Sequence, residues 1–329
     1  MLQEIKERVL NGGQITPEEA VALVQSEEKE AFYAAADEIR KYFKGDFMEM
    51  CSIMNAKSGK CTQDCKWCSQ SMFHKTNVEE YELVDLKEAE DLAAENAAKG
   101  VYRFSLVTSG RSISNKNLDQ LCGVYKNIQK SIPIHLCASM GLLNRSQLEK
   151  LREVGVGHYH CNIETAPSYF KEVCTSHTME DKIRTIRMAR ETGMGICSGG
   201  IIGMGETMEQ RIEMAFTLRE LEIESIPLNV LMPVEGTKLA EHKPLTDEEI
   251  LNTFALFRFI NPKANIRLAG GRNLISHIQD KALKAGVSAA LVGDYLTTIG
   301  TNINQDKSIF QDAGFSLDHE MLLNKAEVK

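Results

Sequence analysis

The stretch DLKEAEDLAAENAAKG (85–100), followed after Val101 by YRFSLVT (102–108), contains one unit of a pattern that repeats along the chain. Asp85 can accept hydrogen bonds from the free backbone N–H groups of a helix start, together with Glu88, and Gly100 is a typical helix stop. The segment 102–108 is short and largely apolar, as expected of a buried strand. The sequence therefore predicts a helix that leads directly into a strand.

Units of this kind recur after Gly45. Longer amphipathic helix patterns lie between the expected strands. One of them is TMEQRIEMAFTLREL, in which Thr207 is the expected N-cap residue. Regular alternation of strand and helix over about 250 residues is typical of a closed parallel barrel, so we expect a TIM-type (βα)8 fold of the α/β class. An open doubly wound sheet is the alternative, but no G-x-G-x-x-G opens a helix after the first strand. The eight expected strands are 47–56, 102–108, 133–139, 157–163, 194–201, 225–232, 264–269 and 288–292.

Three regions are expected along the chain: a helical extension at 1–45, the barrel at 46–315 and a C-terminal tail at 316–329. In the extension, Thr16 stands in a capping position, Pro17 is the first helical residue and Glu19 completes a capping box. The final segment, FSLDHEMLLNKAEVK, is predicted to pack loosely.

Composition and charge argue against several classes of function. The 329 residues include 38 basic and 46 acidic ones, a formal net charge of −8, so we expect no nucleic-acid surface. The N-terminal MLQEIKERVLNGG has no apolar h-region, and no stretch approaches the roughly 18 apolar residues of a membrane span. We therefore expect a cytoplasmic protein without a membrane segment. Cysteines of cytoplasmic proteins are more often metal ligands, catalytic or buried than disulfide-bonded, and we expect the same of the nine in this chain.

Three cysteines form the motif that carries the chemistry. After the first expected strand, KSGKCTQDCKWCSQS places Cys61, Cys65 and Cys68 in C-x3-C-x2-C spacing on a loop. Three such thiolates can converge on one metal site. A zinc site usually has four ligands in two pairs, and no second C-x2-C is present. Three ligands on a four-iron cluster leave one iron open to chelation by S-adenosylmethionine (AdoMet). A zinc knuckle that borrows a remote histidine is the alternative.

A second signal is MGICSGGIIGMGET (194–207), where a strand runs into a glycine-rich turn. Glycines such as Gly199 and Gly200 let a backbone approach a ligand closely, and the carboxyl ends of barrel strands carry the sites. Such a turn is a weak signal by itself.

Six stretches, in this order, resemble the blocks of the biotin synthase family of radical AdoMet enzymes: CTQDCKWCSQS, HYHCNIETAPSYF, ICSGGIIGMGET, PLNVLMPVEGTKLA, IRLAGGR and YLTT. The resemblance implies that a 5'-deoxyadenosyl radical removes hydrogens from dethiobiotin, and that an auxiliary iron-sulfur cluster donates the sulfur that closes the ring of biotin. It also implies a 4Fe-4S cluster on the loop cysteines, AdoMet as cofactor, an electron donor such as flavodoxin or ferredoxin, and a homodimer.

The resemblance also implies roles for individual residues. Those expected to contact AdoMet are Trp67, Asn162, Glu164, Lys182, Gly199 and Gly200. Those expected to contact dethiobiotin are Asn162, Asn229, Thr297 and Thr298. Glu164 stands where the family has Asp, and Lys182 stands where it has Arg, which keeps the charge but loses the bidentate fork. Two plainer interpretations stay open. Trp67 could serve ordinary packing, and His160, which stands where the family has Asn, could be a packed or solvated histidine.

The auxiliary-cluster region departs most from the family. Where the family has three cysteines and one arginine inside the barrel, the chain keeps Cys137, Cys197 and Arg267 but has Ser105 on the second strand. A hydroxyl is a poor iron ligand compared with a thiolate. Cys51, on the neighbouring first strand where the family has Ser, is expected to supply the lost thiolate. The plainer interpretation of Cys51 is a buried small apolar side chain.

Three other cysteines are expected to play a smaller part. Cys161 is the second choice as an auxiliary ligand, because its strand parity is opposite to that of Asn162 and Glu164 and should turn it towards the helix layer. Cys122 and Cys174 fall in helix or loop segments, where buried or idle thiols are expected.

Two rival functions stay open at this point. One is a radical AdoMet barrel enzyme that inserts no sulfur, similar to the hydrogenase-maturation or methylornithine-synthase relatives. Ser105 favours this rival, whereas Cys137, Cys197 and Arg267 speak against it. The other is a non-catalytic iron- or zinc-binding protein in which the loop cysteines are structural.

Overall fold

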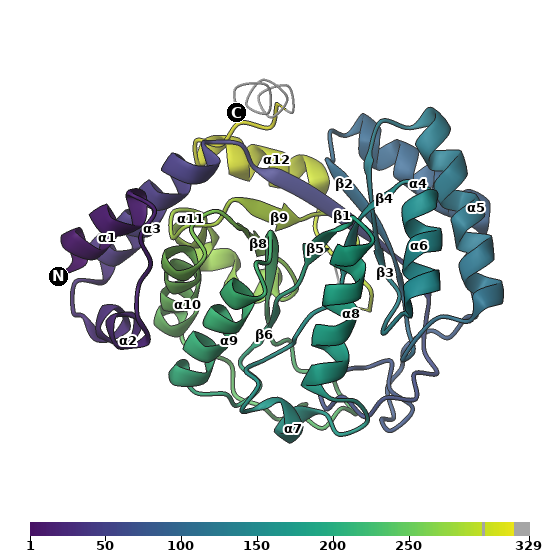
Figure 1. Ribbon diagram of the computed structural model, residues 1–329, viewed down its shortest axis with the longest axis horizontal. Helices are drawn as coiled ribbons and strands as arrows, with labels where there is room; N and C mark the ends of the chain where they lie inside the picture. The colour runs from purple at the N-terminus through teal and green to yellow at the C-terminus, as the bar shows by residue number, and fades with distance from the viewer. Residues whose placement is uncertain (298–299, 319–329) are drawn as a thin grey trace.

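Parallel strands surrounded by helices form the centre of the structure, a computed structural model that describes residues 1–297 and 300–318 (Figure 1). Consecutive strands pair in parallel from β1 to β5, and β9 returns to pair with β1. Both β5 and β6 pair with β7, so the sheet closes. The expected (βα)8 barrel is confirmed. Its strands are β1 (Glu49–Lys57), β2 (Arg103–Thr108), β3 (His135–Ser139), β4 (Val156–His160), β5 (Gly195–Cys197), β6 (Gly200–Ile202), β7 (Ser225–Val230), β8 (Asn265–Leu268) and β9 (Ala289–Leu291).

The fifth expected strand, 194–201, is divided into β5 and β6, and the prediction of one continuous strand is wrong there. The reason is the close approach of the backbone to its neighbours. A Cβ on Gly199 would lie 1.9 Å from the Pro227 carbonyl oxygen, and a Cβ on Gly200 would lie 2.4 Å from the Glu164 carbonyl oxygen. These two glycines therefore let neighbouring backbones come into direct contact at the carboxyl end of the barrel.

Helices cover the outside of the barrel, and their starts agree with the sequence. The Thr16 hydroxyl accepts from the Glu19 N–H at 3.2 Å, and the Asp85 carboxylate accepts from two N–H groups at 2.8 and 3.1 Å. Thr207 also forms a capping box. The outer helices are α4 (Leu86–Ala98), α5 (Asn115–Ser131), α6 (Arg145–Glu153), α7 (Phe170–Val173), α8 (Met179–Glu191), α9 (Met208–Glu220), α10 (Asp247–Ile260), η1 (Arg272–Ile278), α11 (Gln279–Leu283) and α12 (Ile303–Asp312).

The first three helices, α1 (Leu2–Leu10), α2 (Pro17–Gln25) and α3 (Lys29–Lys44), pack on the outside of the barrel beside α10 (Figure 1). In α10 every residue from Ile250 to Ile260 is buried, because α3 covers its outer face. The Tyr33 hydroxyl donates to the Asn252 side-chain oxygen at 3.0 Å, and the Phe32 and Phe259 rings lie 5.4 Å apart. We infer that residues 1–45 form an extension attached to the barrel wall.

The chain after α12 is more tightly bound to the barrel than the predicted tail implies. Phe315 is buried, and the Ser316 backbone bonds to Asp46 and Met48 at the start of β1. The prediction of loose packing is wrong for these two residues, because they complete the backbone hydrogen bonding of that segment. Residues 319–329 of the expected tail lie outside the described residues.

A buried ion pair fixes α12 to the barrel and predicts a large loss of stability on mutation. Arg272 donates to both carboxylate oxygens of Asp306, at 3.0 and 2.6 Å, and to the Leu291 carbonyl oxygen. Asp306→Ala leaves this buried guanidinium without its counter-charge, so we expect the free energy of unfolding to fall by about 3–5 kcal/mol. Urea unfolding of the cluster-free chain measures it. Asp91→Ala, at the exposed Lys87–Asp91 pair, is the matched control and should leave the midpoint nearly unchanged. Equal midpoints for the two variants would contradict the assigned role of the buried pair.

Candidate active site

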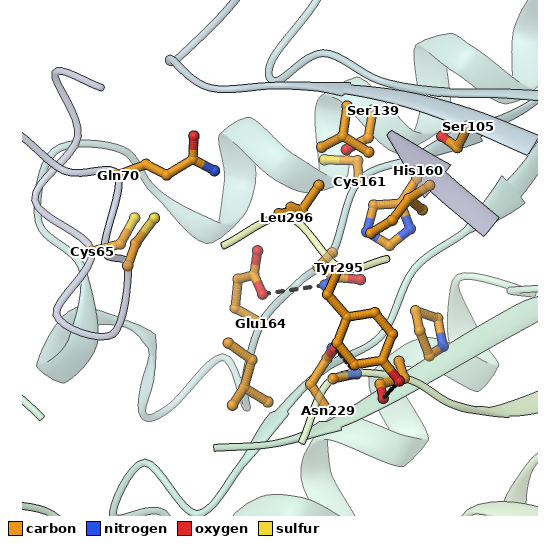
Figure 2. Close-up of a pocket in the computed structure, with 18 of the residues that line it drawn as sticks. Cys65, Gln70, Ser105, Ser139, His160, Cys161, Glu164, Asn229, Tyr295 and Leu296 are labelled. Atoms are coloured by element: carbon orange, nitrogen blue, oxygen red, sulfur yellow. Dashed lines mark hydrogen bonds between the residues drawn. The ribbon is translucent and has the colours of Figure 1, made fainter. Parts of the chain in front are cut away.

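A single cavity of about 460 Å³ runs from the loop after β1 into the barrel interior. This volume is in the usual range for small-molecule sites. Figure 2 shows Cys65 on one side of the cavity, Ser105 and Cys161 on the other, and Glu164 between them. The expected site residues that line it are Cys51, Cys61, Cys65, Trp67, Cys68, Cys137, Cys161, Asn162, Glu164, Lys182, Cys197, Asn229, Arg267 and Thr297.

Two expected residues are not part of the cavity lining. Gly199 and Gly200 lie beside the cavity, and their lack of a side chain is explained by the backbone contacts described above. Thr298 lies outside the described residues.

The loop that carries Cys61, Cys65 and Cys68 is held by backbone hydrogen bonds. The Cys61 N–H donates to the Gln70 carbonyl oxygen at 3.0 Å, and the Cys68 N–H donates to the Cys65 carbonyl oxygen at 3.1 Å. Burial, together with the charge of Cys61, raises the pKa of Cys68 to about 11. The three thiols thus lie close together in a setting where metal binding, which removes their protons, is the natural way to ionise them.

Trp67 both lines the cavity and takes part in ordinary packing, the two roles that the sequence left open. Its side chain lines the cavity, and it also packs against the apolar cluster of Val173, Met204, Leu231 and Leu239. Packing therefore fixes the indole at the edge of the cavity.

Polar side chains at the end of β4 meet a cation from α8. The Asn162 side-chain N–H donates to one Glu164 carboxylate oxygen at 3.3 Å, and Lys182 Nζ lies 3.5 Å from the other. The Asn162 side-chain oxygen accepts from the Gly199 N–H at 2.9 Å. Glu164 has φ of 70°, a left-handed conformation that is unusual outside glycine and tends to occur at functional sites. A carboxylate and an ammonium group are thus displayed together to the cavity.

Asn229 lies on β7 at the same end of the barrel. Its amide donates to the Gly200 carbonyl oxygen at 3.0 Å and accepts from the Gly270 N–H at 2.8 Å. One donor and one acceptor position of the amide therefore stay available to a molecule in the cavity. Thr297, across the cavity mouth, is hydrogen-bonded to Ser69 at 3.0 Å.

Cys51, Cys137 and Cys197 lie deeper in the barrel. Burial, opposed by Arg267 and reinforced by the charges of Cys137 and Cys197, raises the pKa of Cys51 to about 12. Burial also raises the pKa of Cys137 to about 11. Cys137 and Cys197 act on the ionisation of Cys51, and Cys197 acts on that of Cys137, so the three thiols form one group.

Two arginines and one glutamate, of which only Arg267 was expected, surround this group. Glu49 bonds to Arg267 Nη2 and accepts from Arg103 Nε at 2.9 Å. Burial alone would raise the pKa of Glu49, but Arg103 and Arg267 outweigh burial and lower it to about 2. The sequence signal was available, because Glu49 precedes Cys51 by two residues and so shares its strand face. The two arginines leave a net positive charge beside the thiols.

Ser105 and His160 complete this deep region. The Ser105 hydroxyl is buried and has no hydrogen-bond partner among the described residues. His160, whose role the sequence left open, places Nδ1 3.3 Å from Cys197 Sγ. His160 is therefore a partner of the Cys197 thiol. The unpartnered hydroxyl of Ser105 lies at the position where the family has a cysteine.

The expectation that Cys161 faces the helix layer is wrong, because Cys161 lines the cavity. The strand β4 ends at His160, so strict alternation of side chains does not extend to the next residue. The charged groups that affect the ionisation of Cys161 are Lys182 and Glu164, whereas those near Cys51 are Arg267 and the other deep thiols.

Cys174 is buried, as expected, but it is not isolated. Its Sγ lies 3.6 Å from Cys65 Sγ and 3.3 Å from His177 Nδ1. Sequence reasoning missed this contact, because 109 residues separate the two cysteines. Cys122, on α5, lies outside the cavity lining.

Comparisons with known proteins agree with this geometry. Residues 56–218 match the radical SAM superfamily, and residues 227–316 match the Biotin and Thiamin Synthesis associated domain. The biotin synthase of Parabacteroides distasonis is 50% identical over 96% of this chain and 97% of its own length. Those of Porphyromonas gingivalis and Clostridium tetani are 48% and 46% identical over 97% of this chain and 97% and 99% of their own lengths.

Solved structures confirm the fold. Methylornithine synthase superposes with a TM-score of 0.82 at 18% identity, covering 98% of this chain and 99% of its own. The hydrogenase maturase HydG gives 0.81 at 18% identity, covering 95% and 74%. At such identities the likeness extends to the fold alone, whereas the sequence relatives share the whole chain. The chain therefore belongs to the biotin synthase family of radical AdoMet enzymes.

Proposed function

We propose that the chain converts dethiobiotin to biotin by AdoMet-dependent radical chemistry and sulfur insertion. The observation that carries the proposal is one cavity with a thiol group at each end. Cys61, Cys65 and Cys68 lie on the loop side, and Cys51, Cys137 and Cys197 lie in the barrel interior. An enzyme of this family needs two iron-sulfur clusters within reach of one substrate, and this arrangement meets that need. The rival without sulfur insertion has no use for the deep thiols.

The loop residues fit a 4Fe-4S cluster with AdoMet, the cofactors of this family. Three thiols on a short, hydrogen-bonded loop leave one iron for AdoMet, and the reduced cluster supplies the electron that cleaves it. Lys182 would bind the AdoMet carboxylate, and Asn162 and Glu164 would hold its ribose hydroxyls through the oxygens and N–H groups that face the cavity. Trp67, fixed by packing, would bound the adenine.

The deep residues fit the auxiliary cluster, which would supply the sulfur. Cys51, Cys137 and Cys197 would be its thiolate ligands, with Cys161 as the second choice for one of them. Arg267 would remain protonated, because it is bonded to Glu49, and would offset the charge of the thiolates. The unpartnered hydroxyl of Ser105 would then contact the cluster without serving as a ligand.

Dethiobiotin would lie between the two groups of thiols. Asn162 and Asn229 would bind its ureido group, and Thr297 its carboxylate. Thr298 is proposed for the carboxylate as well, although it lies outside the described residues.

The Asn229→Ala variant is expected to lower dethiobiotin turnover while leaving substrate-independent AdoMet cleavage largely intact. Loss of one hydrogen bond to a neutral group costs on the order of 1–3 kcal/mol, which is roughly a 5- to 150-fold change in turnover. Asn117→Ala, at a buried amide outside the cavity, is the matched control and should keep both activities. An equal loss of both activities in Asn229→Ala would remove Asn229 from the substrate site.

Anaerobic reconstitution with iron and sulfide tests the metal content of the proposal. We expect brown protein with several irons and matching sulfide per chain. Colourless protein with stoichiometric zinc would instead support a structural metal site and contradict the proposal.

The proposed reaction needs an electron donor, and the family suggests a compartment and an oligomeric state. We infer that a small electron-transfer protein such as flavodoxin or ferredoxin supplies the electron, and that the chain acts in the cytoplasm as a homodimer. Within residues 1–297 and 300–318, none of the helices has the length and apolar character to span a bilayer.

A further inference from the structure

One group of potential metal ligands lies outside the two proposed cluster sites, although it shares one residue with the loop. Cys65, Cys174 and His177 place their ligand atoms within 4.8 Å of one another. We propose that the chain without its loop cluster binds one divalent, thiophilic cation, Zn²⁺ or Fe²⁺, between these three side chains. This mononuclear site goes beyond the proposed function, and it would be occupied before the loop cluster is assembled or after it is lost.

The distances between the ligand atoms are those of a tetrahedral site. With metal–sulfur bonds of about 2.3 Å and metal–nitrogen bonds of about 2.0 Å, two sulfur ligands lie about 3.8 Å apart, and sulfur and nitrogen about 3.5 Å. Cys65 Sγ and Cys174 Sγ lie 3.6 Å apart, and Cys174 Sγ lies 3.3 Å from His177 Nδ1 and 3.9 Å from Nε2. The sulfur–sulfur separation therefore needs a change of only a few tenths of an ångström, whereas the imidazole must turn to bring the Nε2 lone pair to the cation.

A hydrogen bond to Gln63 sets which nitrogen of the histidine is free to bind a cation. His177 Nδ1 lies 2.9 Å from the Gln63 side-chain oxygen, which can only accept, so Nδ1 carries the proton and Nε2 has the free lone pair. A metal-bound histidine usually donates its other N–H to such an oxygen, and this second hydrogen bond fixes the ring. The Phe170 ring, edge-on to the imidazole at 5.6 Å, restricts it further.

The backbone around Cys174 is fixed against the cysteine loop. Asp64, the residue before Cys65, accepts from the Thr175 and Ser176 N–H groups at 3.0 and 2.9 Å. Its own N–H donates to the Ser176 hydroxyl at 3.0 Å. This two-way connection holds Cys174 beside Cys65 without any metal, so the two sulfurs need little rearrangement to bind a cation. Two thiol protons leave when the cation binds.

The site opens to the cavity and leaves one coordination position of the cation free. Cys65 and His177 both line the cavity, which gives the cation a path in. Three protein ligands leave the fourth tetrahedral position to water or an added thiol. Because Cys65 belongs to both sites, the cation and the loop cluster exclude each other.

Cobalt titration of the full chain tests the proposal. Tetrahedral Co²⁺ bound by thiolates has intense visible absorption, so Co²⁺ is added to reduced, cluster-free protein under anaerobic conditions. The deep thiols also bind metals, and the assignment therefore rests on variants. We expect Cys174→Ser to lose one equivalent of tetrahedral Co²⁺, and Cys61→Ser/Cys68→Ser to keep it. We expect Gln63→Leu, which removes the second hydrogen bond, to weaken that equivalent about 10- to 100-fold.

The opposite pattern would overturn the proposal. If Cys174→Ser binds as much Co²⁺ as the parent while Cys61→Ser/Cys68→Ser loses one equivalent, the loop thiols alone bind it. Absence of any tetrahedral signal in the parent has the same consequence. Displacement of the bound Co²⁺ by Zn²⁺ or by Fe²⁺, each titrated alone, identifies the preferred cation.

A second arm separates this proposal from the proposed function. Zn²⁺-loaded parent protein should take up iron and sulfide at the loop more slowly than Cys174→Ser treated in the same way. If the cobalt result holds but the two rates are equal, the cation site stands, and the assignment of Cys65 to the loop cluster is the claim that fails.

Discussion

Replacing Cys65 with alanine is expected to abolish the reductive cleavage of AdoMet. The three loop thiolates jointly hold the cluster that delivers the electron, and no other residue of the loop offers a thiolate. Formation of 5'-deoxyadenosine under anaerobic, reducing conditions measures the effect. Cys122→Ala, a buried cysteine outside the cavity lining, is the matched control and should cleave AdoMet at the parent rate.

Cys174 requires one additional variant in this experiment. Its sulfur lies only 3.6 Å from that of Cys65, so it is close enough to replace the missing ligand. If Cys65→Ala still cleaves AdoMet but Cys65→Ala/Cys174→Ser does not, Cys174 has taken over the role. Cleavage at the parent rate by both variants would show that the loop does not hold the cluster.

Replacing Cys51 with serine is expected to remove the deeper cluster and leave the loop cluster in place. Strands β1 and β2 are direct neighbours; Cys51 lies opposite Arg103, two residues before the Ile53–Ser105 pair. A ligand lost at Ser105 can therefore be replaced from Cys51 by a shift of about one strand spacing, near 5 Å, across the sheet and about 7 Å along it. The cluster would then lie closer to β1, and a four-iron and a two-iron form are both compatible with three thiolates.

Iron and sulfide counts with Mössbauer spectra on Cys51→Ser and Cys161→Ser decide between the two candidates. We expect Cys51→Ser to lose one of two clusters and all biotin formation, while its loop cluster and AdoMet cleavage persist. Cys161→Ser should keep both clusters, because its charged neighbours are Lys182 and Glu164. Loss of the second cluster only in Cys161→Ser would identify Cys161 as the ligand.

The barrel and the loop site could be predicted because their signals are local in sequence. The capping boxes at Thr16 and Thr207, the alternation of strands and helices, and the spacing of Cys61, Cys65 and Cys68 all lie within short windows. The positions of the expected strands agree with the structure for the same reason, except where Gly199 and Gly200 divide the fifth and where the fourth ends earlier, at His160.

Contacts between distant segments could not be predicted in this way. The approach of Cys174 to Cys65 depends on how the turn before α8 packs on the loop after β1. The pairing of Glu49 with Arg103 and Arg267 depends on which strands close the barrel. Cys161 was misplaced because strand parity was applied beyond the end of β4, a boundary that backbone hydrogen bonds determine and the sequence pattern does not mark.

An anaerobic turnover assay with dethiobiotin, AdoMet and a strong reductant shows whether the chain forms biotin. We predict that the reconstituted chain forms both biotin and 5'-deoxyadenosine, and that biotin formation requires AdoMet. Formation of 5'-deoxyadenosine without any biotin, from protein shown to contain both clusters, would contradict the proposed conversion of dethiobiotin to biotin.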